Sequence, residues 1–245
     1  MSPTNTNFST AAIQGDNRGY TAYHAPRYAF ILQLLGQLGV SKSSRILDIG
    51  SSRLTELLAE RFETSVDSLG FGPDRPSTTG QHFQFDLNQA QDEAGWRRDL
   101  AAYDVVVMAE VIEHLYTAPQ LVLAFVRTLL QDGGLLLIQT PNAASLQKRI
   151  KMAMGRNPYE MIRLDTTNPG HFREYTIREL RRLAEGAGFR VERQATAFYF
   201  DARYARHGDN GDRPQPVIGA IKNSIYPMLP AGLREGVTMI WRRPR

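Results

Sequence analysis

The sequence contains no cysteine. Disulfides, thiolate metal sites, iron–sulfur clusters and cysteine nucleophiles are therefore excluded, and any chemistry depends on carboxylates, imidazoles, hydroxyls and the backbone. No apolar run approaches the roughly 20 residues that a membrane-spanning helix requires. The first 20 residues also lack the charged and then apolar pattern of a secretory signal. These absences predict a cytoplasmic protein without a membrane span.

A large excess of one charge is also missing. The 245 residues include 29 basic and 25 acidic side chains, for a net charge of +4. A balance this close to neutral disfavours a nucleic-acid partner. The first 17 residues are small and polar, and we expect them to be flexible. No repeat or linker follows, so the sequence predicts a single domain over residues 18–245.

Helical and strand-like apolar patterns alternate along the chain. An apolar stripe near residues 31–38 predicts a first helix, and further helices are expected over 54–62, 122–130 and after Thr176. Strands are expected over 45–50, 65–67, 82–87, 103–109, 135–139, 189–200 and 236–241. This alternation predicts an α/β fold with a doubly wound parallel sheet, helices on both faces and ligands at the carboxyl ends of the strands. Outside the sheet we expect an N-terminal helical cap at 18–44 and two acceptor-side insertions, a lid at 143–175 and a second at 201–234.

A turn of small residues, Asp48 to Ser52, joins the first strand to the next helix. Such a turn lets a ligand approach the backbone closely. Asp67 is expected at the end of the second strand, where a carboxylate can accept both hydroxyls of a ribose. Asp86 closes the third strand between Phe85 and Leu87, a combination that can bond the amino group of adenine and cover its ring. The glycines of the G-x-G-x-x-G motif of NAD enzymes are missing.

In this order the motifs resemble those of the class I S-adenosylmethionine-dependent methyltransferases, over about residues 27 to 200. ILDIGSS, VDSLG and FDLN resemble the glycine-rich, ribose-binding and adenine motifs of that family. The later segments YDVVVMAEVIEHL, GGLLLIQTPN and GHFREYTIRELRRLAEGAGF resemble the branch of ubiquinone-biosynthesis, sugar and natural-product O-methyltransferases. The resemblance implies a Rossmann-like sheet of seven strands with the last one antiparallel, and S-adenosylmethionine as cofactor.

The resemblance also implies a set of cofactor-binding residues: Asp48, Gly50, Ser52, Asp67, Asp86, Leu87 and Glu110. Ser52 departs from the family, which usually has a second glycine there, so a hydroxymethyl group stands at the closest approach to the methionine moiety. This departure motivates a second hypothesis, a catalytically silent relative that keeps the fold as a binding module.

Glu110, Glu113 and His114 follow the 103–109 strand at i, i+3 and i+4, so that one helical turn can aim them at a common point. His171, within the expected lid, is a fourth candidate ligand. Such a set suits a divalent cation such as Mg²⁺, and it resembles the magnesium-dependent ubiquinone-pathway enzymes and the small-RNA 3′-terminal 2′-O-methyltransferases. In the competing interpretation no metal is bound, and Glu110 contacts the cofactor region. The candidate catalytic residues are His114, His171 and Glu110, with His114 or His171 as the general base.

Arginines and lysines gather after residue 147. Most are expected on solvated helix faces, but Arg156, Arg163 and Arg173 are candidates for pairing with a phosphate or carboxylate of the acceptor. Tyr23 either contacts the acceptor or packs an N-terminal helix on the sheet. The sequence thus predicts methylation of a hydroxyl on a sugar, nucleotide sugar or secondary metabolite. An RNA terminal ribose 2′-O-methyltransferase is the alternative enzyme, and a homodimer is left open.

Overall fold

The computed structural model describes residues 18–100, 102–164, 169–204 and 216–245. The expected flexible segment 1–17, part of the expected lid (165–168) and part of the second insertion (205–215) lie outside the described residues. Two compact units are present. The larger comprises Gly39–Ala197 and Leu229–Arg245, and the smaller comprises Met1–Leu38 and Phe198–Met228. The single domain over 18–245 stays a prediction.

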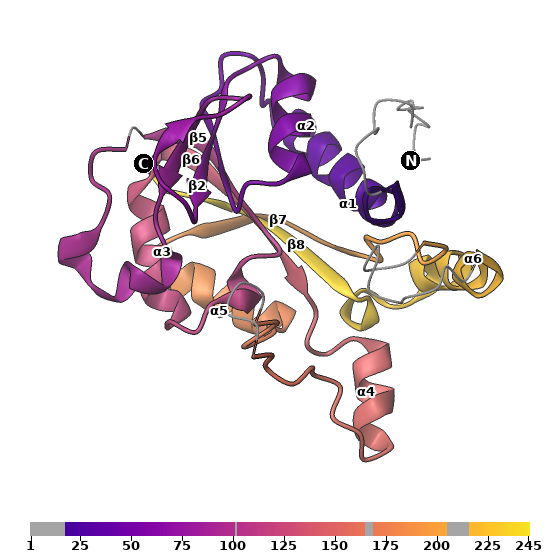
Figure 1. The fold of residues 1–245 in the computed structure, drawn as a ribbon. Helices are drawn as coiled ribbons and strands as arrows, with labels where there is room; N and C mark the ends of the chain where they lie inside the picture. The colour runs from indigo at the N-terminus through magenta and orange to yellow at the C-terminus, as the bar shows by residue number, and fades with distance from the viewer. Residues whose placement is uncertain (1–17, 101, 165–168, 205–215) are drawn as a thin grey trace. The chain divides into compact units, whose positions relative to one another are not determined.

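The larger unit is built on one sheet with the strand order β3-β4-β2-β1-β5-β6-β8-β7 (Figure 1). Its eight strands are β1 (Ile46–Ile49), β2 (Val66–Gly70), β3 (Arg75–Pro76), β4 (Gln81–Gln84), β5 (Tyr103–Ala109), β6 (Leu130–Pro141), β7 (Arg190–Ala197) and β8 (Gly236–Arg242). The run from β4 to β6 is parallel, whereas β3 pairs antiparallel with β4, and β8 pairs antiparallel with both β6 and β7. The predicted sheet with an antiparallel last strand is confirmed. One strand more than the expected seven is present, the two-residue β3.

Helices cover both faces of this sheet. The helices of the larger unit are α2 (Arg53–Phe62), α3 (Pro119–Thr128), α4 (Leu146–Ala153) and α5 (Ile177–Gly186), with the 3-10 helices η2 (Leu87–Gln91), η3 (Glu93–Gly95), η4 (Ile112–His114) and η6 (Ala231–Leu233). α2 lies on one face, and α3 and α5 lie on the other (Figure 1). Each presents apolar residues to the sheet at a four-residue spacing, such as Leu54 with Leu58 on α2 and Val122 with Val126 on α3. The central strands β1 and β5 are buried along most of their length, as expected between two helical layers.

One helix of the larger unit was not predicted. α4 occupies Leu146–Ala153, within the expected lid. None of its residues is buried, so it lacks the inward apolar stripe by which a sequence usually reveals a helix.

The smaller unit contains α1 (Arg18–Gln37), α6 (Pro216–Ile225) and η5 (Tyr226–Met228). Tyr23 of α1 stacks on Phe200 with ring centroids 4.8 Å apart, and its carbonyl accepts a hydrogen bond of 2.9 Å from the N–H of Asp201. The helical cap expected at the N-terminus therefore packs on residues that follow β7. Acceptor contact by Tyr23 stays a prediction. In neither unit do the described residues form a helix long and apolar enough to cross a membrane.

Candidate functional site

A cavity of about 410 Å³ lies at the carboxyl ends of the parallel strands, where an open α/β sheet binds its ligands. The ends of β1, β2 and β4 and the segment after β5 form its walls. The lining residues are Ile49, Gly50, Ser51, Leu69, Gly70, Phe71, Arg75, His82, Phe85, Asp86, Leu87, Val111 and Leu115. Most of these walls are apolar, and Arg75 and Asp86 are the charged lining residues. The cavity therefore suits a small ligand with an aromatic part and few polar groups.

Gly50, at the end of β1, lines the cavity with its backbone. Its φ is +84°, in the left-handed region that favours glycine. A Cβ atom at this position would lie 3.3 Å from Cγ2 of Val111 on the opposite wall. The neighbouring Asp48 is buried, and its carboxylate accepts a hydrogen bond of 2.6 Å from Oγ1 of Thr55 on α2. Asp48 thus ties the turn to the helix, while Gly50 leaves room for a ligand.

Ser52 caps α2. Its backbone is extended (φ −155°), its hydroxyl accepts a hydrogen bond from the N–H of Leu54, and its own N–H donates to Oγ1 of Thr55. No glycine is required by this backbone conformation, and a serine at an N-cap stabilises the helix. Ser51, rather than Ser52, lines the cavity.

The predicted position of Asp67 is wrong. β2 runs from Val66 to Gly70, so Asp67 is its second residue and not its last. The carboxylate accepts hydrogen bonds from the N–H of Gln81 at 2.9 Å and from the hydroxyl of Tyr103 at 3.0 Å. Asp67 therefore joins three strands near the end of the sheet opposite the cavity.

Asp86 lies where it was expected. It follows β4, it lines the cavity beside Phe85 and Leu87, and one carboxylate oxygen accepts hydrogen bonds from the N–H and the side-chain amide of Asn88. As the N-cap of η2, Asp86 holds its carboxyl group just beyond the carboxyl end of β4. The arrangement is suited to an adenine ring lying between apolar side chains with a carboxylate at its edge.

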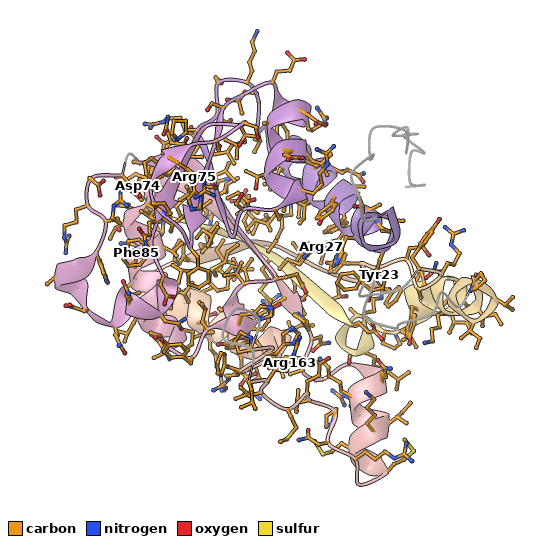
Figure 2. The ribbon with its side chains drawn as sticks, in the orientation of Figure 1. Tyr23, Arg27, Asp74, Arg75, Phe85 and Arg163 are labelled. Carbon is orange, nitrogen blue, oxygen red and sulfur yellow. The ribbon has the colours of Figure 1, made fainter. Side chains whose placement is uncertain are left out.

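The residues that follow β2 were not predicted, because the expected end of that strand was too early in the chain. Phe71 and Arg75 line the cavity there, and Figure 2 labels Arg75 beside Asp74. Asp74, beside Arg75, accepts hydrogen bonds from the guanidinium of Arg97 and from the N–H of Gln84, and these bonds lower the pKa of Asp74 to about 2. The Gly-Pro pair at 72–73 is the sequence signal that marks the true end of β2. Arg75 is therefore the charged side chain that β2 and its turn bring to the cavity.

Glu113, His114 and His171 come together beside the cavity. One potential ligand atom from each lies within 4.8 Å of the other two. Glu113 is fully buried and accepts a hydrogen bond of 2.9 Å from Oγ1 of Thr140 on β6, while the two imidazoles meet edge to face with centroids 4.7 Å apart. Three of the four predicted ligands, Glu113, His114 and His171, therefore lie close together.

Hydrogen bonds orient both imidazoles. Nδ1 of His114 lies 2.9 Å from the carbonyl oxygen of Gly170, and Nδ1 of His171 lies 3.1 Å from the carboxylate of Glu174. Because these oxygens accept, the proton of each neutral ring is assigned to Nδ1 and the lone pair to Nε2. Glu174 also pairs with Lys148 of α4. Glu174 was not predicted as a site residue, although it follows His171 by three residues.

The prediction that one helical turn carries Glu110 into this cluster is wrong. η4 begins only at Ile112, and Glu110 has a left-handed backbone (φ +59°) with its N–H donating to the carbonyl of Gln139 at 2.8 Å. Glu110 is not a member of the group of close ligand atoms. A left-handed conformation in a non-glycine residue costs about 1–2 kcal/mol, and strain of this kind clusters at functional sites. Cofactor contact by Glu110 stays a prediction.

Two of the three arginines expected to bind the acceptor have acidic partners. Arg163 lies 3.4 Å from Glu160, and Arg173 lies 2.7 Å from Glu179. Arg156 is exposed in the loop after α4. Acceptor binding by these arginines stays a prediction.

A family model described as a methyltransferase domain matches residues 20–194, which is more than half of the chain. The chain belongs to the methyltransferase domain family. The matched region begins in α1 and ends in β7, so it includes the cavity and the cluster of Glu113, His114 and His171. The site of this methyltransferase thus lies within the part that defines its family.

Similar proteins carry related names. A protein of Mycolicibacterium smegmatis named "Probable S-adenosylmethionine-dependent methyltransferase" is 39% identical over 111 residues, which cover 44% of this chain and 38% of that protein. The methyltransferase in the Haloferax volcanii complex with the Trm112 methyltransferase activator superposes with a TM-score of 0.60, at 12% identity over 94% of this chain and 93% of that one. The 1,6-didemethyltoxoflavin-N1-methyltransferase of Burkholderia thailandensis, with S-adenosylhomocysteine bound, has a TM-score of 0.52, at 16% identity over 92% of this chain and 81% of that one. At these identities, the two structures establish the shared fold.

Proposed function

We propose that this methyltransferase transfers the methyl group of S-adenosylmethionine to a hydroxyl oxygen of a small acceptor with neighbouring oxygens, such as a sugar, a nucleotide sugar or a secondary metabolite. The position of η4 carries the proposal. Val111 and Leu115, which flank η4, line the cavity, and η4 itself supplies Glu113 and His114. A cavity suited to the cofactor and a cluster suited to a diol are therefore neighbours. The sequence resemblance to O-methyltransferases supports the same acceptor atom.

The cavity offers a distinct group to each part of the cofactor. We propose that the turn at Gly50 and Ser51 receives the methionine moiety, because the missing side chain of Gly50 permits close backbone contact. Asp86, with Phe85 beside it, receives the adenine. Arg75 then faces the ribose, since the carboxylate of Asp67 is engaged elsewhere in the sheet.

The cluster also fits a divalent cation. Glu113 supplies a buried carboxylate and His114 and His171 supply Nε2 lone pairs, a donor set of one oxygen and two nitrogens that suits borderline ions and admits Mg²⁺. The acceptors at both Nδ1 atoms are the outer partners that metal-ligating histidines have. We propose these three residues as ligands, and a bound ion would lower the pKa of an acceptor hydroxyl.

The imidazole of His171 is the proposed base if no ion is held. Glu174 binds the Nδ1 proton, so Nε2 is the atom that accepts the hydroxyl proton, and the carboxylate stabilises the imidazolium that forms. At Nδ1, His114 meets the neutral carbonyl oxygen of Gly170. The charge on Glu174 therefore favours His171 over His114 in this role.

Transfer of a tritiated methyl group from S-adenosylmethionine to a panel of catechols, sugars with vicinal hydroxyls, monohydroxyl compounds and amines tests the proposal. We expect the label on an oxygen of a catechol or vicinal diol. If EDTA abolishes transfer and Mg²⁺ or Mn²⁺ restores it, the proposed cation site is supported. If transfer resists EDTA but falls in His171→Ala, His171 is supported as the base. Label on amines alone, or equal transfer to monohydroxyl compounds, would contradict the proposal.

A further inference from the structure

The segment 146–164, which contains α4, turns large apolar side chains toward solvent. In α5, an ordinary surface helix of the same unit, Leu180 and Ala184 are buried and the arginines are exposed. In α4 no residue is buried. The exposed apolar residues of the segment are Ile150, Met152, Met154, Met161, Ile162 and Leu164. Exposed apolar side chains gathered in this number mark a surface that binds another molecule.

The charged side of α4, and not its apolar side, holds the helix to the larger unit. The ammonium of Lys148 pairs with Glu174 and lies 3.3 Å from the carbonyl oxygen of Asn142. Ile150 is turned by about 200° around the helix from Lys148, and Met154 lies one turn further on the same side. Their exposed fractions are 49% and 56%. α4 therefore points its apolar side away from the unit, and Figure 1 shows the helix standing clear of the sheet.

The same segment is strongly basic. It contains five basic residues, Lys148, Arg149, Lys151, Arg156 and Arg163, against the single acidic Glu160. Five minus one gives a net charge of +4, which equals the net charge of all 245 residues. An apolar face flanked by lysine and arginine is the pattern of a helix that lies in the interface of an anionic bilayer. A second copy of this chain would bring the same positive charge against the segment, and a nucleic acid would leave the apolar side chains unused.

We infer that segment 146–164 docks on the surface of an anionic lipid bilayer. Ile150, Met154 and the exposed apolar residues of 161–164 enter the boundary between headgroups and acyl chains. Of the basic side chains, Arg149, Lys151 and Arg156 contact the anionic headgroups, since Lys148 and Arg163 pair with Glu174 and Glu160. The unbranched methionines adapt to such a disordered boundary. This inference concerns attachment at a surface and does not depend on the proposed chemistry of the cluster.

Co-sedimentation of the full chain with vesicles of phosphatidylcholine alone, or mixed equally with phosphatidylglycerol, tests the inference. We expect binding to the mixed vesicles at least about tenfold stronger than to phosphatidylcholine, and weaker at high salt. Ile150→Glu with Met154→Glu should weaken binding to mixed vesicles by about tenfold. Leu121→Glu on α3, where the parent side chain is 41% exposed, is the matched control and should bind like the wild type.

A second variant tests the charge separately. Lys151→Glu with Arg156→Glu should weaken binding to mixed vesicles while leaving the apolar side chains in place. Equal binding to both vesicle types, or undiminished binding by both double variants, would overturn the inference. Self-association of the wild type in sedimentation velocity, without vesicle binding, would also overturn it in favour of a second copy. Calorimetric titration with S-adenosylhomocysteine should give equal affinity for the wild type and the Ile150/Met154 variant. Loss of vesicle binding in that variant is then distinguished from loss of the proposed cofactor binding.

Discussion

Asp67 and Asp86 differ in what their carboxylates bond. Asp67 receives hydrogen bonds from Gln81 of the neighbouring β4 and from Tyr103 of β5, and burial together with the charge of Asp67 raises the pKa of the Tyr103 phenol. Asp86 lines the cavity and caps η2. The first carboxylate therefore holds the sheet together, and the second is available to the cofactor.

The matched variants Asp67→Asn and Asp86→Asn test this division. Asp67→Asn should lower the free energy of unfolding by about 1–2 kcal/mol, since it weakens charge-assisted hydrogen bonds, and should leave the affinity for S-adenosylhomocysteine within about twofold. Asp86→Asn should weaken that affinity by about tenfold through loss of the charge at the adenine. Urea unfolding and calorimetry measure the two quantities. Loss of cofactor affinity in Asp67→Asn without loss of stability would contradict the assignment.

The pKa of Asp74 tests the contact between Asp74 and Arg97 beside the cavity. Its pKa of about 2 arises chiefly from the hydrogen bond of Arg97, so the stability that this contact contributes is complete above the ordinary pKa of 3.8 and is lost as the pH falls through about 2. In an NMR titration of the carboxyl carbon we expect a midpoint near 2 in the wild type. Arg97→Gln should move the midpoint back toward 3.8. Arg98→Gln, which removes an exposed partner of Glu93, should leave it unchanged.

At the scale of elements, Ser52 begins α2 as its N-cap, at the position where the sequence resemblance implies a glycine. Ser52→Ala should lower the free energy of unfolding by about 1 kcal/mol because the N-cap is lost, and Ser52→Gly should lower it by only a few tenths. Both variants should keep their affinity for S-adenosylhomocysteine, since Ser51 is the serine that lines the cavity. Thermal unfolding and calorimetry check this. A gain of cofactor affinity in Ser52→Gly would show instead that the hydroxymethyl group obstructs the methionine moiety.

Strand and helix positions were predicted better than their ends. Apolar and β-branched residues indicate that a strand exists, but pairing decides where it stops. β2 continues to Gly70 because Ser68–Gly70 pair with β4, and the residue at its carboxyl end is therefore not the predicted aspartate. The i, i+3, i+4 spacing after β5 likewise predicts convergence only for helical backbone, and the left-handed Glu110 breaks that condition.

At the scale of the whole molecule, the order of motifs along the chain predicted the sheet and its antiparallel last strand. The contacts that complete the site were not predictable in the same way, because they join distant positions. His114 meets the carbonyl of Gly170, 56 residues later, and Lys148 meets Glu174, 26 residues later. The residue types and their spacing predicted the members of the cluster. The partners that orient them depend on tertiary contacts and were not predicted.

The central claim is that the cluster beside the cavity is the centre of methyl transfer. The most direct test compares wild type and His171→Ala, using calorimetry with S-adenosylhomocysteine and single-turnover transfer of labelled methyl to the best acceptor of the panel. The account predicts unchanged cofactor affinity and transfer slower by about 10²–10⁴-fold, the range expected when a base or its equivalent is removed. Unchanged transfer in His171→Ala, or a loss no larger than its loss of cofactor affinity, would contradict it.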